Sequence, residues 1–323
     1  MHNKKITAFS LVEISVVIII LMVMIAGLVQ SSRLIAASRL TSARNLTSSS
    51  AMPWINYIVA WHDTTSLQAF TEEENNNGKK ISSWSGAEIR TNDRVSLIQD
   101  DDSKRPTLIT NALYGLPALK FDGTDDYLIS KNTEQDVLSY RSGSIFIVFE
   151  PRDVVSNKKN TIFHNQSDCG LELDIGHTFA SKGDFGISSG SGNCGSIAAT
   201  TTSFDFAVLN ERVIVSIIIY QSPTSSGSTS NVKIFRNGFP KTVSATNNGY
   251  NSSQISSTSL YSTGLHNFVY GARKANSSAN PESFFNGLLG EIIIFSRSVN
   301  NEDRRDIERY LGKKWGIKVN YGE

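Results

Sequence analysis

One short stretch of the chain carries alternating carboxylates, Glu172-Leu173-Asp174. Residues two apart on a β-strand point to the same face, so these two side chains would lie side by side. A retaining glycoside hydrolase needs a nucleophile and an acid/base, which a Glu-x-Asp-x-Glu strand supplies with its first and third carboxyl groups. The next alternate position holds Gly176, which leaves the pair without a further acid. We therefore expect no catalytic residue on this strand.

A second acidic group lies in the sequence DGTDD, where Asp122, Asp125 and Asp126 could offer oxygen ligands to Ca²⁺. The alternative is a turn in which Asp and Gly make local backbone hydrogen bonds, and that alternative is favoured. No other cofactor is indicated. The five histidines are scattered, and the chain has no HExxH motif, phosphate-binding loop or nucleophile elbow. The expected protein is not an enzyme.

The two cysteines, Cys169 and Cys194, are candidates for one disulfide bond. They lack the CxxC spacing and the nearby histidines of a zinc site, and His177 alone gives poor support for one. Disulfides form outside the cytoplasm, where this part of the chain is expected to lie. Two free buried thiols are the alternative.

Near its start the chain has an apolar run, AFSLVEISVVIIILMVMIAGLVQ, which contains a single carboxylate, Glu13. Residues 9–29 have the length of a membrane-crossing helix. An ionisable group within such a helix usually has a partner or a function. His2, Lys4 and Lys5 precede the run and predict that the amino end stays on the cytoplasmic side.

The leader KKITA, followed by FSLVE and an uninterrupted apolar helix, resembles the start of type IV prepilins and pseudopilins. The resemblance covers about the first 45 residues. It implies that a prepilin peptidase cuts between Ala8 and Phe9 and that the new amine of Phe9 is methylated. It also implies that Glu13 faces the terminal amine of a neighbouring subunit and sets its register. The family most often has Gly before the cut, where this chain has Ala8.

The helix is expected to continue beyond the membrane, because Ala36, Leu40 and Ala43 share one face at helical spacing. The alternative is a solvated linker whose arginines meet lipid headgroups. The polar residues 47–50 and then Pro53 end the helix. The expected organisation is a leader over residues 1–8, a pilin-like helix over 9–47 and a β domain over 54–323.

Beyond Pro53 the pattern is one of short strands separated by Ser, Asn, Gly and Thr, without alternating long helices. This predicts a mainly β fold, an antiparallel sandwich. The strands are expected at residues 144–149, 213–220, 232–235, 267–270 and 291–295, and the segments 224–230 and 245–259 are expected to be loops or hairpin tips.

Several motifs of the chain are informative together: Trp61-His62-Asp63, ISSWSG, RPTLITNALYGLPALKFDGTDDYL, GSIFIVFEP and the closing FFNGLLGEIIIFSRSVNNEDRRDIERYLGKKWGI. Taken together, they resemble concanavalin A-like, laminin G-like jelly-roll domains of bacterial surface proteins.

The closing helix is also predicted from its own residues. Asn300 is a suitable N-cap, and Gly316 ends the helix. Ile307, Tyr310, Leu311 and Trp315 share the face that would pack on the sandwich. Trp315 and Trp61 are accordingly expected in the core rather than at a ligand.

The near balance of 31 basic and 30 acidic side chains argues against a nucleic-acid surface. We expect a minor or tip pilin-like subunit of the bacterial inner membrane, and then of a pilus or the cell surface, that presents a jelly roll for adhesion to glycans or surfaces. Its partners would be the membrane, the peptidase and other pilin-like subunits. The alternatives are a pseudopilin of a type II-like secretion system and a membrane-tethered glycan hydrolase.

Overall fold

The structure is a computed structural model that describes residues 10–52, 55–87, 95–130, 142–153, 160–166, 171–175, 185–189, 197–201, 208–224, 227–241, 243–245, 254–256, 267–274 and 279–322. Its elements in chain order are α1 (Leu11–Ser49), β1 (Ile58–Asp63), β2 (Ser83–Trp84), β3 (Leu97–Ile98), the 3-10 helix η2 (Asp102–Lys104), β4 (Thr107–Leu113), β5 (Leu116–Asp122), β6 (Leu128–Ser130), β7 (Gly143–Pro151), β8 (Asn160–Asn165), β9 (Leu171–Ile175), β10 (Phe185–Ser189), β11 (Ile197–Thr201), β12 (Val213–Thr224), β13 (Gly227–Arg236), β14 (Phe239–Lys241), β15 (Val243–Ala245), β16 (Gln254–Ser256), β17 (Phe268–Tyr270), β18 (Asn286–Phe295) and α2 (Asn301–Trp315).

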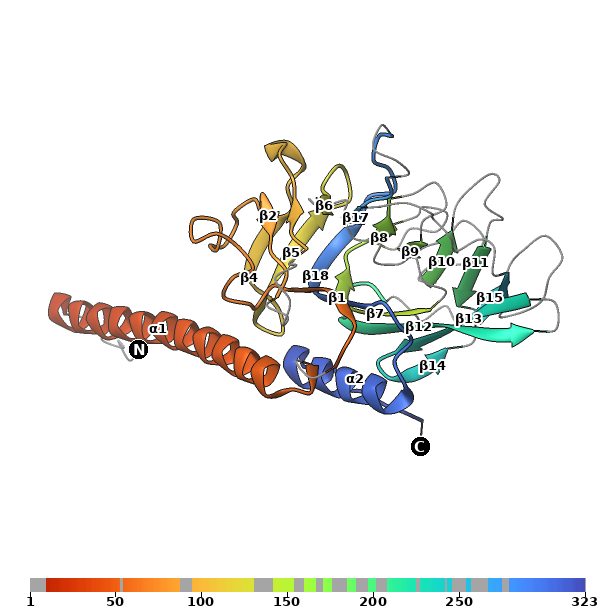
Figure 1. Cartoon of the computed structure of the whole chain (residues 1–323). Coiled ribbons are helices and arrows are strands. Elements are labelled where there is room, and N and C mark those ends of the chain that lie inside the picture. The colour runs from red at the N-terminus through yellow and green to blue at the C-terminus, as the bar shows by residue number, and fades with distance from the viewer. Residues whose placement is uncertain are drawn as a thin grey trace, which may run out of the picture.

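The strands form two antiparallel sheets that face one another (Figure 1). The helix-side sheet has the order β14-β13-β12-β7-β18-β5-β4, with β1 added to β18 and β16 added to β13. The outer sheet has the order β15-β11-β10-β9-β8-β17-β6-β3-β2. A first hydrophobic core, with side chains such as Trp84, Phe163 and Ile292, fills the space between them. The mainly β sandwich expected from the sequence is therefore confirmed.

The five strands predicted from β-branched and aromatic runs fall on β7, β12, β13, β17 and β18. Of residues 224–230, expected to be a loop or hairpin tip, the described ones are strand residues at the end of the long β12–β13 hairpin, where Thr224 pairs with Gly227. Within residues 245–259, however, β16 pairs with β13. This Ser- and Asn-rich segment thus contains a strand that is held by its pairing with β13. Its composition did not predict that strand.

The C-terminal helix α2 has the ends and the buried face that its sequence predicts. The Asn300 side chain accepts a hydrogen bond from the Asp303 N–H at 2.8 Å, and Gly316 adopts the left-handed conformation with φ 62°. Ile307, Leu311 and Trp315 are buried in a second core on the outer face of the helix-side sheet. Beneath this helix the pairing of β18 with β7 shifts register between Leu289 and Glu291, on either side of Gly290.

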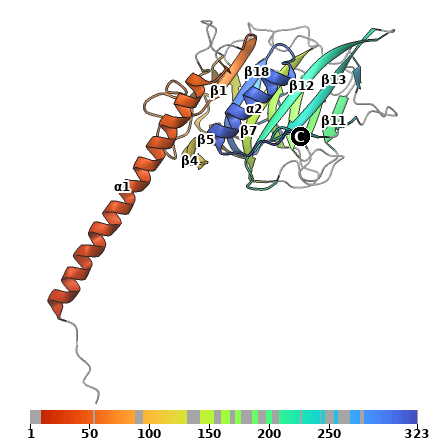
Figure 2. The same ribbon diagram turned by 90° about the horizontal axis from the view of Figure 1, so that it is seen from below.

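Helix α1 is 39 residues long, which corresponds to roughly 58 Å, and its two halves differ in their surroundings. In the second half, Ala43 is only 3% exposed, and Leu40 packs against the same second core, which confirms the predicted apolar face. Met52, just beyond the helix, is buried there too. This half of α1 therefore belongs to the globular unit, alongside α2 (Figure 2).

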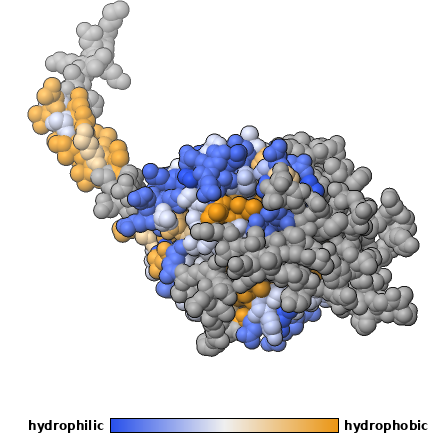
Figure 3. All heavy atoms as spheres, turned by 45° about the horizontal axis from the view of Figure 1, so that its top comes forward, coloured by the Kyte–Doolittle hydropathy of each residue, from blue (hydrophilic) through white to orange (hydrophobic). Residues whose placement is uncertain are grey.

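Between Leu11 and Ile25 the large apolar side chains of α1 are exposed. Their exposed fractions range from 45 to 85% over Leu11, Val12, Ile14, Val16, Val17, Ile18, Ile19, Ile20, Leu21, Met22, Val23, Met24 and Ile25. Figure 3 shows them as an orange arm that projects from the body of the molecule. Within the described part of the chain, no helix combines the length and the hydropathy that crossing a bilayer requires.

Candidate functional site

Several residues predicted from the sequence lie outside the described residues. They are the two at the expected processing point, Ala8 and Phe9, and the two cysteines, Cys169 and Cys194. Cleavage, methylation and the disulfide bond therefore stay predictions.

Glu13 stands at the third position of α1 and closes a capping box. Its Oε2 accepts a hydrogen bond from the Ser10 N–H at 2.8 Å, while the Ser10 side chain accepts from the Val12 N–H at 3.4 Å. This arrangement satisfies backbone donors at the helix start, and a carboxylate there also complements the helix dipole. Glu13 thus has a local role in the helix, in addition to the predicted role in assembly.

The acidic residues Asp122, Asp125 and Asp126 come together after β5, with ligand oxygen atoms all within 4.8 Å of one another. The same loop also makes the local hydrogen bonds to backbone N–H groups that are expected if it is only a turn. Asp122 Oδ1 accepts from the N–H groups of Thr124 at 2.7 Å and Asp125 at 3.3 Å, and Asp126 Oδ2 accepts from the Asp122 N–H. Burial, and then the charge of Asp122, raises the pKa of Asp126 to about 7. The loop can be held by its own bonds or by a cation, and both interpretations stay open.

Glu172 and Asp174 share one face of β9, as their alternation predicts, and both are buried. The hydroxyl of Thr161 on β8 lies 2.9 Å from Glu172 Oε1 and 3.0 Å from Asp174 Oδ1. Arg273 Nε lies 3.4 Å from the other Glu172 oxygen. The paired carboxylates are therefore held by a hydroxyl and a guanidinium. Gly176 lies outside the described residues.

A buried charged network, which the sequence did not reveal, lies between α2 and the helix-side sheet. Glu291 Oε1 accepts from Trp61 Nε1 and from the Tyr310 hydroxyl, each at 2.8 Å. Glu291 Oε2 accepts from Trp315 Nε1 at 2.8 Å and lies 2.9 Å from Lys314 Nζ. Both predicted core tryptophans are buried, and their indole N–H groups satisfy one carboxylate.

Lys314 joins this network to α1 and β1. Its ammonium donates to Asp63 Oδ2 at 2.6 Å, to the Tyr310 hydroxyl at 2.9 Å and to Thr47 Oγ1 on α1 at 3.1 Å. Burial raises the pKa of Glu291, and the charge of Lys314 opposes that shift. One signal in the sequence could have indicated this buried charge, because Lys314 lies on the apolar face of α2 at helical spacing from Ile307.

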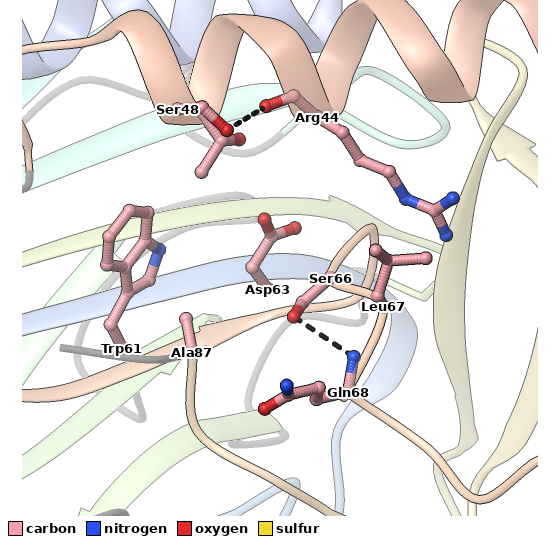
Figure 4. A pocket seen from close by; sticks show the side chains of 9 residues that line it. Arg44, Ser48, Trp61, Asp63, Ser66, Leu67, Gln68 and Ala87 are labelled. Atoms are coloured by element: carbon pink, nitrogen blue, oxygen red, sulfur yellow. Dashed lines mark hydrogen bonds between the residues drawn. The ribbon is translucent and has the colours of Figure 1, made fainter.

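A pocket with a volume of about 330 Å³ opens beside this network, between the end of α1 and the loop after β1. Figure 4 shows Arg44 and Ser48 reaching down from α1 and Asp63 pointing up between them and the loop. The lining residues of the described chain are Arg44, Thr47, Ser48, Trp61, Asp63, Ser66, Leu67, Gln68 and Ala87. The pocket therefore contains an arginine, several small polar side chains and an aromatic wall.

The charged groups of the pocket are held in place. Arg44 Nε donates to the Thr65 carbonyl oxygen at 2.8 Å, and Asp63 Oδ1 accepts from both the N–H and the hydroxyl of Thr65 at 2.8 Å. Burial lowers the pKa of Arg44, while the nearby Asp63 carboxylate opposes that shift. A guanidinium keeps its proton in proteins, so Arg44 brings a fixed positive charge to the pocket.

No protein-family model matches the chain. A search of curated proteins also finds no match.

Solved structures with a similar chain path are carbohydrate-related domains and toxin binding domains. Domain 4 of AbnA, a GH43 extracellular arabinanase from Geobacillus stearothermophilus in complex with arabinotriose, is 13% identical with a TM-score of 0.46, over 80% of this chain and 98% of that domain. The binding domain of botulinum neurotoxin serotype D/C is 11% identical with a TM-score of 0.47, over 79% of this chain and 52% of that one. The match thus spans about half the length of the neurotoxin domain. At such identities, the function of this chain must be argued from its own residues.

Proposed function

We propose that the protein is a pilin-like subunit, minor or at the tip of a filament, that enters the membrane and then the filament with the first half of α1 and presents the sandwich for binding. The observation that carries this proposal is the contrast between the two halves of α1. Thirteen large apolar side chains between Leu11 and Ile25 are exposed, whereas Ala43 and Met52 are buried against the sandwich.

Exposed apolar side chains at this density need apolar surroundings, because each one left in water forgoes up to about 1.5–3 kcal/mol. A bilayer supplies such surroundings before assembly, and a bundle of equivalent helices supplies them afterwards. The prepilin-like start of the chain supports the same interpretation. A carboxylate at Glu13 would then be paired with the terminal amine of a neighbouring subunit in a medium of low dielectric.

Contacts made by the second half of α1 support a sandwich that is fixed rigidly to this helix. Lys314 and Tyr310 of α2 both contact the Thr47 hydroxyl, and Arg44 binds the Thr65 carbonyl oxygen. Contacts from several elements make the junction stiff, so a subunit placed by its helix also places its binding domain. A domain of this bulk would crowd a filament built from it alone, which favours low copy number.

The test compares the wild-type chain with Glu13→Ala and Glu13→Gln in a host that assembles pili. We expect normal membrane insertion of all three and reduced recovery of both variants in sheared filaments. Gln retains an oxygen that can accept the Ser10 N–H in the capping box, so a loss with Gln isolates the effect of charge. Normal incorporation of both variants would discard the pairing role. Recovery only with secretion components would instead favour the pseudopilin alternative.

We also propose that the sandwich catalyses no reaction. The buried pair Glu172 and Asp174 is the feature that would argue otherwise. We expect no release of reducing sugar from a panel of polysaccharides by the full chain. Release that disappears in Glu172→Gln would replace the binding role by hydrolysis.

A further inference from the structure

We infer that the pocket between α1 and the β1 loop binds the carboxylate of an acidic sugar, with Arg44 as the group that recognises it. The inference deepens the proposed binding role of the sandwich, and it rests on that role. The acidic sugar is a uronic or sialic acid unit.

The hydrogen bonds of Arg44 leave part of its guanidinium available. Nε is used by the Thr65 carbonyl oxygen at 2.8 Å, which fixes the plane of the group. Among the described residues, neither of its two Nη atoms makes a hydrogen bond or an ion pair. A guanidinium with two parallel N–H donors matches the two oxygens of a carboxylate. An oxyanion is therefore the ligand group that best completes this side chain.

The other charge of the pocket does not compete for the same role. Asp63 is only 1% exposed, and its oxygens already receive hydrogen bonds from Lys314 and from Thr65. Its oxygens are thus bonded by donors of the protein itself, and its charge acts on Arg44 without a hydrogen bond between these two described side chains. Arg44 is therefore the charged group at the cavity that has no hydrogen-bonded anion among the described residues.

The remaining lining residues fit a sugar ring. Ser48 and Ser66 place hydroxyl groups at the cavity, and Gln68 adds an amide (Figure 4). Trp61 forms an apolar wall, and its indole is held in position by the bond from Nε1 to Glu291. Aromatic and polar groups on opposite sides suit a ring with an apolar face and hydroxyl groups at its edge.

The size of the pocket limits the ligand to a small unit. A volume of about 330 Å³ lies at the lower end of the range of about 300–1,000 Å³ for small-molecule pockets. A single sugar residue is therefore expected inside, either free or at the end of a longer glycan. Because α1 supplies Arg44, Thr47 and Ser48, the site is complete only when the helix is docked.

The experiment uses the full chain in detergent micelles and measures binding by calorimetry and by tryptophan fluorescence. The probes are glucuronic acid and N-acetylneuraminic acid, with glucose as the neutral partner of glucuronic acid. We expect at least one acid to bind, glucose to bind far more weakly, and Arg44→Gln to weaken the acid by about tenfold or more. Added salt should weaken binding as well.

Arg39→Gln is the matched control, because Arg39 lies on the same helix but contacts the Tyr114 carbonyl oxygen and ring instead of the pocket. We expect it to bind the acid as the wild type does. Equal binding of glucose and glucuronic acid, unchanged binding by Arg44→Gln, or no binding of either acid overturns the inference.

Two further arms separate the sources of the ligand and the two proposals. An oligosaccharide with a terminal uronic acid that binds at least as tightly as the free acid identifies a glycan end, and tighter binding of the free acid identifies a free sugar acid. Either result supports the site. Filament recovery of Arg44→Gln is measured alongside and is expected to be normal. Loss of binding with normal recovery separates this site from the assembly role of Glu13.

Discussion

Lys314 Nζ lies 2.6 Å from Asp63 Oδ2, and both side chains are fully buried where α2 crosses the end of β1. The same ammonium lies 2.9 Å from Glu291 Oε2 and 3.1 Å from Thr47 Oγ1 on α1. One cation thus ties together two strands and both helices. The junction that fixes the projecting helix to the sandwich is centred on it.

Replacing Lys314 by Met should therefore destabilise the protein by about 3–5 kcal/mol, because two buried carboxylates lose the charge that compensates them. Urea denaturation, followed by tryptophan fluorescence, measures the change. Lys313→Met is the control, since that neighbouring side chain is exposed and should change the free energy of unfolding by less than about 0.5 kcal/mol. Equal effects of the two substitutions would contradict the compensation.

His62 should make the protein less stable in mild acid. Its Nε2 lies 2.8 Å from the Val95 carbonyl oxygen, which can only accept, so Nε2 carries the proton and Nδ1 accepts from the Tyr270 hydroxyl. Burial lowers the pKa of His62 to about 4. The unfolded chain then binds this proton more readily than the folded chain between about pH 6.5 and pH 4, and stability falls as the pH falls through that window.

The loss amounts to about 3 kcal/mol when the pH is below the folded-state pKa. His62→Gln removes the titrating group, so the difference in unfolding free energy between about pH 7 and pH 4 should be smaller in the variant. Asp126 and Glu291 shift stability in the opposite direction, but they do so in both chains and cancel in the comparison. The same pH dependence in wild type and variant would show that His62 is not responsible.

Asp126→Asn should stabilise the protein at about pH 8 by about 1–2 kcal/mol, a figure reduced for solvent screening. The pKa of Asp126 is raised to about 7, so folding disfavours its ionised form, and the benefit of the neutral form disappears as the pH rises through 7. The Asn oxygen can still accept from the Asp122 N–H. Thermal unfolding measures the change, and Asp125→Asn, at the half-buried neighbour, is expected to have a smaller effect.

Millimolar Ca²⁺ distinguishes the two interpretations of this loop. A bound cation would stabilise the wild-type chain and leave Asp126→Asn less affected, which would reverse their order. An unchanged order would show a turn held by its own hydrogen bonds.

Shortening the chain should show where the globular unit begins. A chain of residues 51–323 loses the Thr47 hydroxyl next to Lys314 and the buried side chain of Ala43. We expect it to be less stable than residues 34–323 by about 2 kcal/mol or more, as measured by urea denaturation. The chain of residues 34–323 should be nearly as stable as the full chain, because the described large apolar side chains of the removed part are exposed. Equal stability of the two shorter chains would place α1 outside the unit.

Local rules were enough for the parts of the fold that depend on neighbours in sequence. The N-cap Asn300, the C-cap Gly316 and the face of α2 follow from spacing alone, since capping and helical period involve only a few adjacent residues. The loop of Asp122 to Asp126 gathers its carboxylates for the same reason. The strand β16 was missed because its place depends on β13, which is distant in the chain.

The sequence by itself determined the long helix with its apolar first half, the antiparallel sandwich, the terminal helix and the shared face of Glu172 and Asp174. Only the tertiary structure decided that Lys314, Asp63 and Glu291 form one buried network and that Arg44 stands over a pocket. These side chains come from α1, β1, β18 and α2, and no periodicity relates positions so far apart in the chain. Their meeting follows from packing, because a buried charge is tolerated only where the fold brings its partner.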